Sequence, residues 1–578
     1  MANGFGSLFI GSSGIQSAQN ALNTTANNLA NVNTKGYVRQ QVRFSDKRYD
    51  ILQDPSTTVN LHQSGLGVSI GDVVHARDIF LDKSYRLEKG RESFYETCYE
   101  TTSYVEDMLQ ELDGEQFKQS VQDLWVSFQE LSKTPADSVT QNLVIQKAGL
   151  LLSRSQKLYD DLKEYQLNIN AQIQDDVAEL NKIGDRLFEI NKQIQNAESN
   201  GVETSMTLRD ERDALLDDLS ALTKADVRED PWGFVFVEIE GVEFVNEMGC
   251  THIGLSTDKT TGFSTPIWPQ LSDPSKNVNI PVYRTDMDIS SEMNTDVGGI
   301  KAKLLMRGDT FGVYSDLMAD PELSKEGEVT YNAYKAIEDK VVVETEAEID
   351  FLVHEIVTAM NNIFSPLKEV ETDITDANGN VIIKKGTKIL DEENASLGAD
   401  KELPPRELFE RMGMERYTEV EVDGKTYYVY NEEDPADTNS LYRLNNLQIN
   451  EDLTRQVTLL PAFTQNGAVN YALGEQLAKA WEVQGIHINP NDQYPCTFQG
   501  FYDKMIGKLG TDGSIYKSSR DTLTDTVVSI DNSRQQIMGV SSDEELTKMI
   551  KYQSAFNASS RYMSVISEMT ELIVTGLI

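Results

Sequence analysis

Proline is unevenly distributed along this chain of 578 residues, and the distribution limits where long helices can form. Thirteen of the 15 prolines lie between Pro231 and Pro495, and residues 496–578 contain none. A proline inside a helix removes one backbone hydrogen bond and clashes with the preceding turn. The sequence therefore predicts long helices towards both ends, and strands and loops in the middle.

Both ends also carry apolar residues at helical spacing. Near the N-terminus, large apolar residues recur every seven positions with smaller residues on the same face: Leu8, Ile15, Leu22 and Leu29, with Ala18, Thr25 and Val32. Near the C-terminus, the stripe consists of Met549, Tyr552, Phe556, Met563, Ile566 and Ile573, widened by Ala555, Tyr562, Met569 and Leu572. Ser542 and Glu545 are spaced as a capping box at its start. Neither helix has a neighbouring core, so we expect them to pack on each other, on other subunits, or on both.

A helical hairpin is predicted after Pro135. Apolar residues at three- and four-residue spacing run from Leu158 to Ile194. Asn200-Gly201 marks a turn, and a second helix from Leu208 to Leu222 completes the hairpin. Residues 514–538 are also predicted to be helical and could join this bundle from the far end of the chain.

Strand signals dominate the middle. Three hairpin turns are predicted from their residue pairs: Glu240-Gly241 after the strand 234–239, Asn378-Gly379 before the strand 381–383, and Asp423-Gly424 between the strands 419–422 and 425–430. One helix, over about 345–364, interrupts the strands. Residues 366–440 are acidic and rich in turns, which indicates an inserted, solvent-facing part.

These patterns predict an α+β multidomain fold. We expect N- and C-terminal helices that form a coiled-coil-like domain, a helical-bundle rod domain, and β-rich central outer domains. The expected division is 1–40 with 540–578, 41–230 with 500–539, 231–365, and 366–499.

The charge of the chain excludes several kinds of partner. Acidic residues number 93 against 52 basic residues, which gives a formal net charge of −41. Such a surface repels phosphate backbones and anionic lipids, so we expect neither nucleic-acid nor membrane binding. Residues 1–34 contain no charged residue and no long apolar run, so a Sec signal peptide is not expected.

The sequence predicts no catalytic site, no metal site and no cofactor. The five histidines lie in no metal or triad spacing. His354-Glu355 begins like a zinc-helix motif, but position 358 is Thr, so His354 is predicted to lie on a helix surface. Cys98, Cys250 and Cys496 are far apart and are expected to be lone buried thiols.

One segment resembles a known protein family. The stretch from Asn27 to Gln40, NNLANVNTKGYVRQ, is similar to the signature of the flagellar rod, hook and hook-associated axial proteins. Its Asn and Thr side chains can end a helix and bond the turning backbone, and Gly36 permits a left-handed turn. Four further segments resemble the hook-associated members of this family: 65–86, 124–138, 298–309 and 539–569. The third of these contains the tripeptide Arg307-Gly308-Asp309, which the resemblance accounts for.

The resemblance implies a structural subunit of the bacterial flagellum, outside the cell at the hook-filament junction and exported by the flagellar type III apparatus. Its implied partners are copies of itself in a ring, the hook protein, the second junction protein and a cytoplasmic export chaperone. The expected assembly residues are Leu8, Ile15, Leu22, Leu29, Met549, Phe556, Met563, Ile566 and Ile573. The expected signature residues are Asn28, Asn31, Asn33, Thr34, Gly36 and Tyr37, and the expected chaperone-binding residues are Met549, Phe556, Met563 and Met569.

Two alternatives remain open from the sequence. A hook protein of the same axial class would share the terminal motifs but lack the long hairpin from Leu158 to Leu222. A secreted adhesin or enzyme carried on axial termini would place its activity in residues 240–500.

Overall fold

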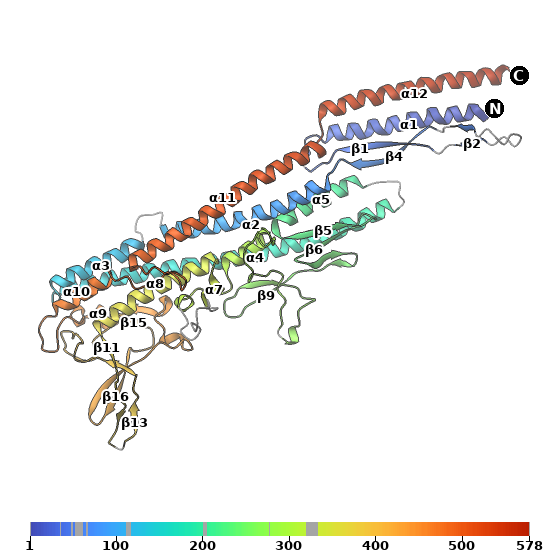
Figure 1. Ribbon diagram of the computed structural model, residues 1–578. Coiled ribbons are helices and arrows are strands. Elements are labelled where there is room, and N and C mark those ends of the chain that lie inside the picture. Colours follow the sequence, from blue (N-terminus) through green and yellow to red (C-terminus); the bar gives the residue numbers. More distant parts are fainter. Residues whose placement is uncertain are drawn as a thin grey trace.

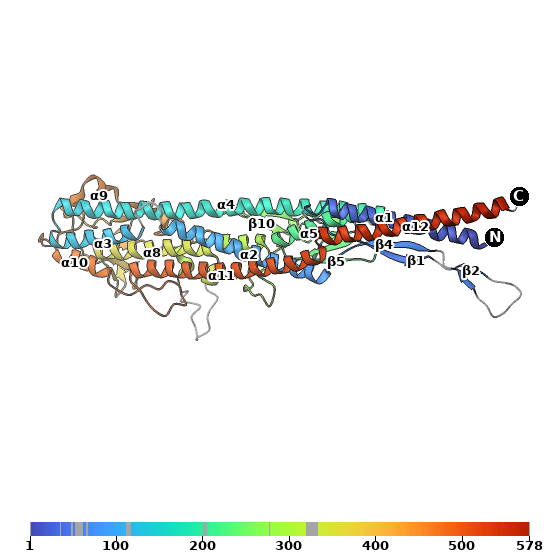
Figure 2. The same cartoon turned by 90° about the horizontal axis from the view of Figure 1, so that it is seen from above.

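A computed structural model of the chain shows an elongated molecule, with long helices along its axis and β-rich parts attached to one side (Figure 1). The structure describes residues 2–34, 36–47, 50–52, 62–64, 67–110, 117–199, 205–276, 278–318, 333–377 and 379–576. Seen from above, the helices form a narrow rod with both chain ends at the same tip (Figure 2).

The tip of the rod consists of the two terminal helices and a strand pair. Helix α1 (Ala2–Ala30) lies beside α12 (Ser542–Gly576), so the helices predicted at the two chain ends are confirmed (Figure 1). Helix α1 also contacts an antiparallel pair formed by β1 (Gln40–Asp46) and β4 (Val68–His75). Strands β2 (Asp50–Leu52) and β3 (His62–Ser64) form a second short pair.

The shaft of the rod is a bundle of long helices. Its members are α2 (Ile79–Gln110), α3 (Phe117–Lys133), α4 (Ser138–Glu198), α5 (Met206–Leu222) and α11 (Phe498–Met538). Helix α11 packs along α2, so the predicted return of the C-terminal region to the bundle is confirmed. It begins earlier than residue 514, because Thr497 caps it by accepting a hydrogen bond from the Gly500 N–H at 3.1 Å. Both helices of the predicted hairpin are present, and its Asn200-Gly201 turn lies outside the described residues.

One large hydrophobic core fills the shaft and its attached parts. It extends from Phe94 to Leu509, and the predicted apolar face of α4 is buried from Leu158 to Ile194. Within the described ranges, no residue of α1 or α12 belongs to this core. The terminal helix pair is therefore held to the shaft by local contacts rather than by the main core.

A buried ion-pair network joins α11 to α2 and α5. Arg534 on α11 places Nε 2.8 Å from Asp82 Oδ1 and Nη2 2.8 Å from Asp217 Oδ2. Its guanidinium carbon lies 4.2 Å from the ring centroid of Tyr85. Arg77 and Arg86 pair with carboxylates of the same network. Burial lowers the pKa of Arg534, but these carboxylates outweigh burial and raise it.

The first β-rich part packs on α4. Strands β5 (Ala225–Glu229), β6 (Val235–Ile239), β7 (Val242–Asn246) and β8 (Gly249–Cys250) form an antiparallel sheet in that order. Glu240 and Gly241 have φ of 48° and 80°, which confirms the predicted turn. Strand β9 (Gly254–Thr257) pairs with β10 (Ser264–Ile267).

The second β-rich part projects from the far end of the shaft (Figure 1). Its main sheet has the order β11 (Leu367–Glu369), β14 (Lys388–Leu390), β17 (Lys425–Tyr430), β16 (Tyr417–Val422). Two small pairs accompany it: β12 (Ile374–Thr375) with β13 (Val381–Ile383), and β15 (Phe409–Arg411) with β18 (Leu447–Ile449). Asp423 and Gly424 have φ of 50° and 79°, which confirms that turn.

Four short helices also occur in the described part of the chain. They are α6 (Gly299–Arg307), α7 (Ala333–Ile337), α9 (Glu451–Arg455) and α10 (Tyr471–Ala480). The predicted central helix is α8 (Val341–Phe364), which packs on α4 and α11. Single 3₁₀ turns cover 274–276, 314–317, 438–440, 444–446 and 457–459.

The prediction for His354 was wrong. The side chain is buried in α8, its Nε2 lies 3.0 Å from Glu433 Oε2, and its ring stacks on Tyr314 with centroids 4.0 Å apart. Burial lowers the pKa of His354, but the bonds to Glu355 and Glu433 outweigh burial and raise it to about 9. The sequence could not show this because Glu433 is 79 positions away.

Glu346 on α8 makes the stability of this region depend on pH. It is fully buried, and its Oε2 accepts a hydrogen bond from the Gly312 N–H at 2.7 Å. Burial raises the pKa of Glu346 to about 8. A raised carboxyl pKa gives stability that is present at low pH and lost as pH rises through the folded-state value. We expect Glu346 to contribute a fall of about 2 kcal/mol in the free energy of unfolding between pH 6 and pH 9.

Glu346→Gln should remove the part of this pH dependence that comes from Glu346, because the amide cannot ionise and can still accept from the Gly312 N–H. His354, whose pKa is raised to about 9, should keep its own contribution over the same pH range. Urea unfolding at a series of pH values, followed by circular dichroism, measures the slope. Glu419 is exposed on β16, so Glu419→Gln is the matched control and should keep the wild-type slope. An unchanged slope in Glu346→Gln would contradict the assignment.

Candidate functional site

The α1–α12 pair is the part of the molecule where the predicted assembly residues meet. Small residues let α12 approach α1 closely. A Cβ added to Gly11 would lie 2.6 Å from Met563 Sδ, and one added to Gly14 would lie 2.7 Å from Ser559 Oγ. Ala18 and Ala21 on α1 are buried as well. The close contact of α1 therefore depends on its small residues rather than on its leucines.

The large apolar residues that recur every seven positions on α1 do not form its most buried face in the single chain. Leu8, Ile15, Leu22 and Leu29 are each only half-buried, while Thr25 of the same expected stripe is buried. On the opposite side, Ser13 Oγ accepts a hydrogen bond from the Val68 N–H of β4 at 3.3 Å. The large apolar residues of α1 thus keep free surface beside the contact with α12, and their role in assembly stays a prediction.

Helix α12 presents two different apolar faces. The first is half-buried towards α1 and contains Met549, Tyr552, Phe556, Met563 and Ile566. Ile573 was predicted on this stripe and is 56% exposed in the single chain. The outward face contains Ile550, Val565, Met569 and Leu572, each more than half exposed. A wide apolar surface of this kind is unusual for a free-standing chain and typical of an interaction site.

The signature segment forms the joint at the base of the terminal pair. Asn28 is buried at the end of α1, and its Oδ1 accepts from the Tyr37 hydroxyl at 2.8 Å and from the Gln40 N–H at 3.0 Å. Its Nδ2 donates to the Gln40 carbonyl at 2.9 Å and to Glu545 Oε2 at 3.0 Å. One amide side chain therefore ties α1, the chain that follows it and the start of α12.

The other signature residues shape the turn after α1. Asn31 Nδ2 donates to the Asn27 carbonyl at 3.0 Å, and the Thr34 hydroxyl lies 3.1 Å from Asn31 Oδ1. Gly36 has φ of 80°, a left-handed conformation that glycine adopts without strain. Asn33 is exposed in the turn. The side-chain bonds to the turning backbone follow the chemistry expected from the sequence.

The predicted capping box at the start of α12 is wrong. Glu545 is only 1% exposed, and its carboxylate bonds Asn28 and Lys548 instead of capping the helix. The Ser541 carbonyl accepts from the Glu545 N–H at 3.0 Å, so the helix starts one residue earlier than the box assumed. The pairing with Asn28, 517 positions away, explains the departure, because a tertiary contact takes up the carboxylate.

Charged groups complete the joint. The Arg39 N–H donates to the Met538 carbonyl at the end of α11 at 2.8 Å, and its guanidinium pairs with Glu544 at 2.8 Å. The Val38 N–H lies 3.4 Å from Asp210 Oδ2 on α5. Burial raises the pKa of Asp210 to about 6, and burial followed by the charges of Asp210 and Glu545 raises the pKa of Tyr37 to about 12. The sequence did not predict Arg39, Asp210 or Glu545 as joint residues, because their partners are distant in the chain.

The α1–α12 pair presents an apolar surface, and hydrogen bonds and ion pairs hold its base in place. At this joint, the described residues bring together no three potential metal-ligand side chains. None of the helices that the structure describes is both long and apolar enough to cross a membrane. The apolar side chains that α12 leaves exposed are suited to packing against other helices.

Comparison with known families finds three matched segments. Residues 102–365 match the family described as flagellar hook-associated protein FlgK helical domain. Residues 8–37 match the flagella basal body rod protein family, and residues 534–575 match the C-terminal family of the flagellar basal body rod FlgEFG proteins. The two terminal matches cover most of α1, the signature segment and α12.

Two individual relatives share the name flagellar hook-associated protein 1. Flagellar hook-associated protein 1 of Bacillus subtilis is 24% identical over 564 residues, which covers 97% of this chain and 96% of that protein. The protein of the same name from Salmonella typhimurium is 28% identical over 217 residues, covering 37% of this chain and 38% of that protein. The solved structure of the flagellar hook junction protein FlgK from Burkholderia pseudomallei aligns with a TM-score of 0.49 at 10% identity, covering 78% of this chain and 99% of that chain.

Proposed function

This chain belongs to the family of flagellar hook-associated protein 1, and we propose that it is a non-catalytic structural subunit that joins the flagellar hook to the filament. The observation that carries the proposal is the α1–α12 pair, which lies outside the main core and exposes large apolar side chains. Such a surface is stabilised when another protein covers it. The proposed assembly residues are those predicted from the sequence, with Ile550, Val565 and Leu572 of α12 added.

The proposed partners are copies of this chain in a ring, the hook protein on one side and the second junction protein on the other. The matches of residues 8–37 and 534–575 to rod-protein families support this, because they lie on the terminal pair. A surface shared among axial proteins can stack one kind of subunit on another. The helical shaft and its β-rich attachments would then lie outside the packed terminal helices.

We propose that export precedes assembly and that a cytoplasmic chaperone covers α12 until then. Met549, Phe556 and Met563 face α1 in the folded chain, whereas Met569 faces outward. In a chain kept unfolded for the type III apparatus, all four side chains would be exposed and prone to aggregate. Methionine-rich apolar faces suit such a partner because their side chains adapt to different surfaces. The chaperone and α1 would therefore compete for one face of α12.

Two observations weigh against a hook protein and against an adhesin that binds through residues 307–309. The match of residues 102–365 to a hook-associated helical domain argues against a hook protein. The tripeptide Arg307-Gly308-Asp309 has the sequence that integrin-type adhesion receptors bind. It is not presented at the surface, because Arg307 is fully buried and donates to Asn170 Oδ1 at 2.6 Å and to the Ser264 carbonyl at 3.0 Å.

A deletion strain tests the proposal. Cells that lack this chain should build hooks of normal length, carry no filaments and release filament subunits into the medium. Electron microscopy and immunoblots of culture supernatants measure these outcomes, and the wild-type gene supplied on a plasmid should restore filaments. Filaments still attached to hooks in the deletion strain would refute the junction role.

A further inference from the structure

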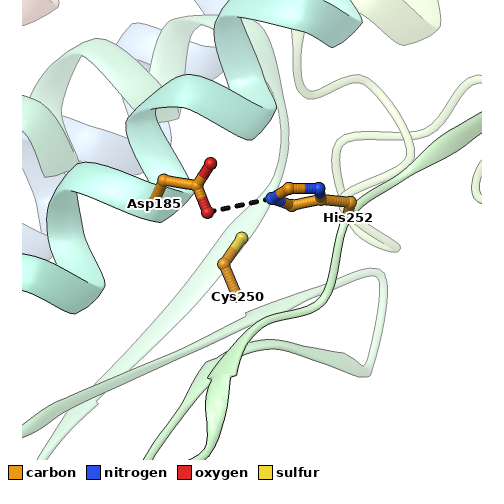
Figure 3. Close-up of side chains that lie close together, drawn as sticks. All are labelled: Asp185, Cys250 and His252. Carbon is orange, nitrogen blue, oxygen red and sulfur yellow. Dashed lines mark hydrogen bonds and ion pairs between the residues drawn. The ribbon is translucent and has the colours of Figure 1, made fainter.

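Three potential metal ligands meet on the side of the shaft (Figure 3). Asp185 comes from α4, Cys250 ends β8, and His252 follows in the next loop. Their nearest ligand atoms all lie within 4.8 Å of one another, and His252 Nε2 is 2.9 Å from Asp185 Oδ1. Within the ranges that the structure describes, this is the one group of three such side chains.

The surrounding structure holds the three residues in place. Asn181, one turn before Asp185, exchanges two hydrogen bonds with the backbone of Ile253, both at 2.9 Å. A Cβ on Gly184 would lie 2.5 Å from Cys250 Sγ, so glycine at this position lets the thiol approach the helix backbone. The loop that carries Cys250 and His252 is therefore fixed against α4 by contacts other than the ligands themselves.

The cluster is open on one side. Cys250 is half-buried, whereas the side chains of His252 and Asp185 are 58% and 57% exposed. An ion can reach the three ligand atoms from solvent, and a water molecule can occupy a fourth position. The net charge of −41 raises the local concentration of cations around the chain.

We propose that Asp185, Cys250 and His252 bind one divalent transition-metal ion of the zinc type. Thiolate, imidazole and carboxylate are the ligands that zinc takes in proteins, most often in tetrahedral geometry. Two ligands on such an ion lie roughly 3.3–3.6 Å apart, given ligand bonds of about 2.0–2.3 Å. His252 Nε2 and Asp185 Oδ1 lie 2.9 Å apart, and all three ligand atoms lie within 4.8 Å of one another, so small side-chain movements would bring them to this spacing.

Metal binding would fasten the first β-rich part to the shaft. One ligand belongs to α4 and two belong to the β8 segment, so the ion links the sheet β5–β8 to the longest helix. The Cys250 thiol gives its proton to the buffer when it becomes a thiolate ligand. Because the ion binds the folded arrangement, it stabilises the folded chain in proportion to its occupancy.

Titration of the full-length, reduced protein tests the site. Calorimetry should show that one zinc ion binds to each chain. Cobalt as a spectroscopic substitute should give a thiolate-to-metal charge-transfer band together with the visible bands of a tetrahedral ion. Cys250→Ser, His252→Gln and Asp185→Asn should each weaken zinc binding on the order of 100-fold, since loss of even an outer-shell partner of a metal site costs about 10–100-fold.

Matched variants separate this site from general binding to an acidic surface. His487→Gln removes another exposed histidine, and Asp161→Asn removes another partly exposed carboxylate of α4. Both should bind zinc as the wild type does. Circular dichroism should show wild-type folding in all five variants. Zinc binding that is equal in wild type and Cys250→Ser, or a cobalt spectrum without the charge-transfer band, would overturn the proposal.

Discussion

Ile573→Asp should leave a normally folded chain, yet cells that carry it should build hooks without filaments. The Ile573 side chain is 56% exposed in the single chain, so the change removes little that the monomer depends on. In the proposed assembly the same side chain is covered, and burying it contributes about 1.5–3 kcal/mol. A loss of about 3 kcal/mol weakens each contact by roughly 100-fold, and a buried unpaired carboxylate adds a further cost. The defect repeats in every subunit of the ring.

Electron microscopy of cells and thermal unfolding of the purified protein measure the two halves of this result. Ile573→Leu is the matched control, because it keeps an apolar side chain of equal size and should support filaments. Normal filaments on Ile573→Asp cells would show that this face of α12 is not an assembly surface. A lowered melting temperature of the purified variant would show that the face supports the monomer.

Arg534→Ala should destabilise the shaft more than any change of an exposed charge. The guanidinium is 5% exposed and forms 2.8 Å contacts with both Asp82 and Asp217. Removing one partner from a buried pair leaves a charge without compensation and costs about 3–5 kcal/mol. Arg77 and Arg86 still neutralise part of the network, so we expect a loss of about 2–4 kcal/mol. Hydrogen exchange should show the loss in the amides of α2, α5 and α11.

Arg520 provides the control on the same helix. It pairs with the neighbouring Asp521, whose side chain is 55% exposed, and an ion pair of that kind contributes roughly 0–1 kcal/mol. Arg520→Ala should therefore change the exchange rates little. Equal protection in Arg534→Ala and Arg520→Ala would mean that the network does not hold α11 to the bundle.

The long helices and the tight turns could be predicted from the sequence because both are encoded locally. Helical spacing from Leu158 to Ile194 repeats within a few residues, and all of α4 follows it. The pairs Glu240-Gly241 and Asp423-Gly424 carry the positive φ values that their hairpins need. The four-part domain division stays a prediction, as do the assembly and chaperone-binding roles of the terminal residues.

Other features could be identified only from the folded chain. His354 was predicted on a helix surface because position 358 is Thr and supplies no second metal ligand. Its partner Glu433, 79 positions away, reaches it only in the folded chain. The metal ligands Cys250 and His252 are close in sequence, but Asp185 is 67 positions from His252 and carries no motif. The face that α1 turns to α12 is lined by Gly11 and Gly14, which have no apolar side chain to form a periodic pattern.

The sequence by itself determined that the two chain ends are helices and that the first helix ends in a turn within the segment from Asn27 to Gln40. Spacing, turn residues and the lack of proline act over one or two helical turns, so they can be read without knowing the fold. Only the tertiary structure decided which faces of α1 and α12 meet and that Asn28 joins them through Glu545, 517 positions away. The physical reason is that close packing and buried hydrogen bonds depend on which surfaces the whole chain brings together.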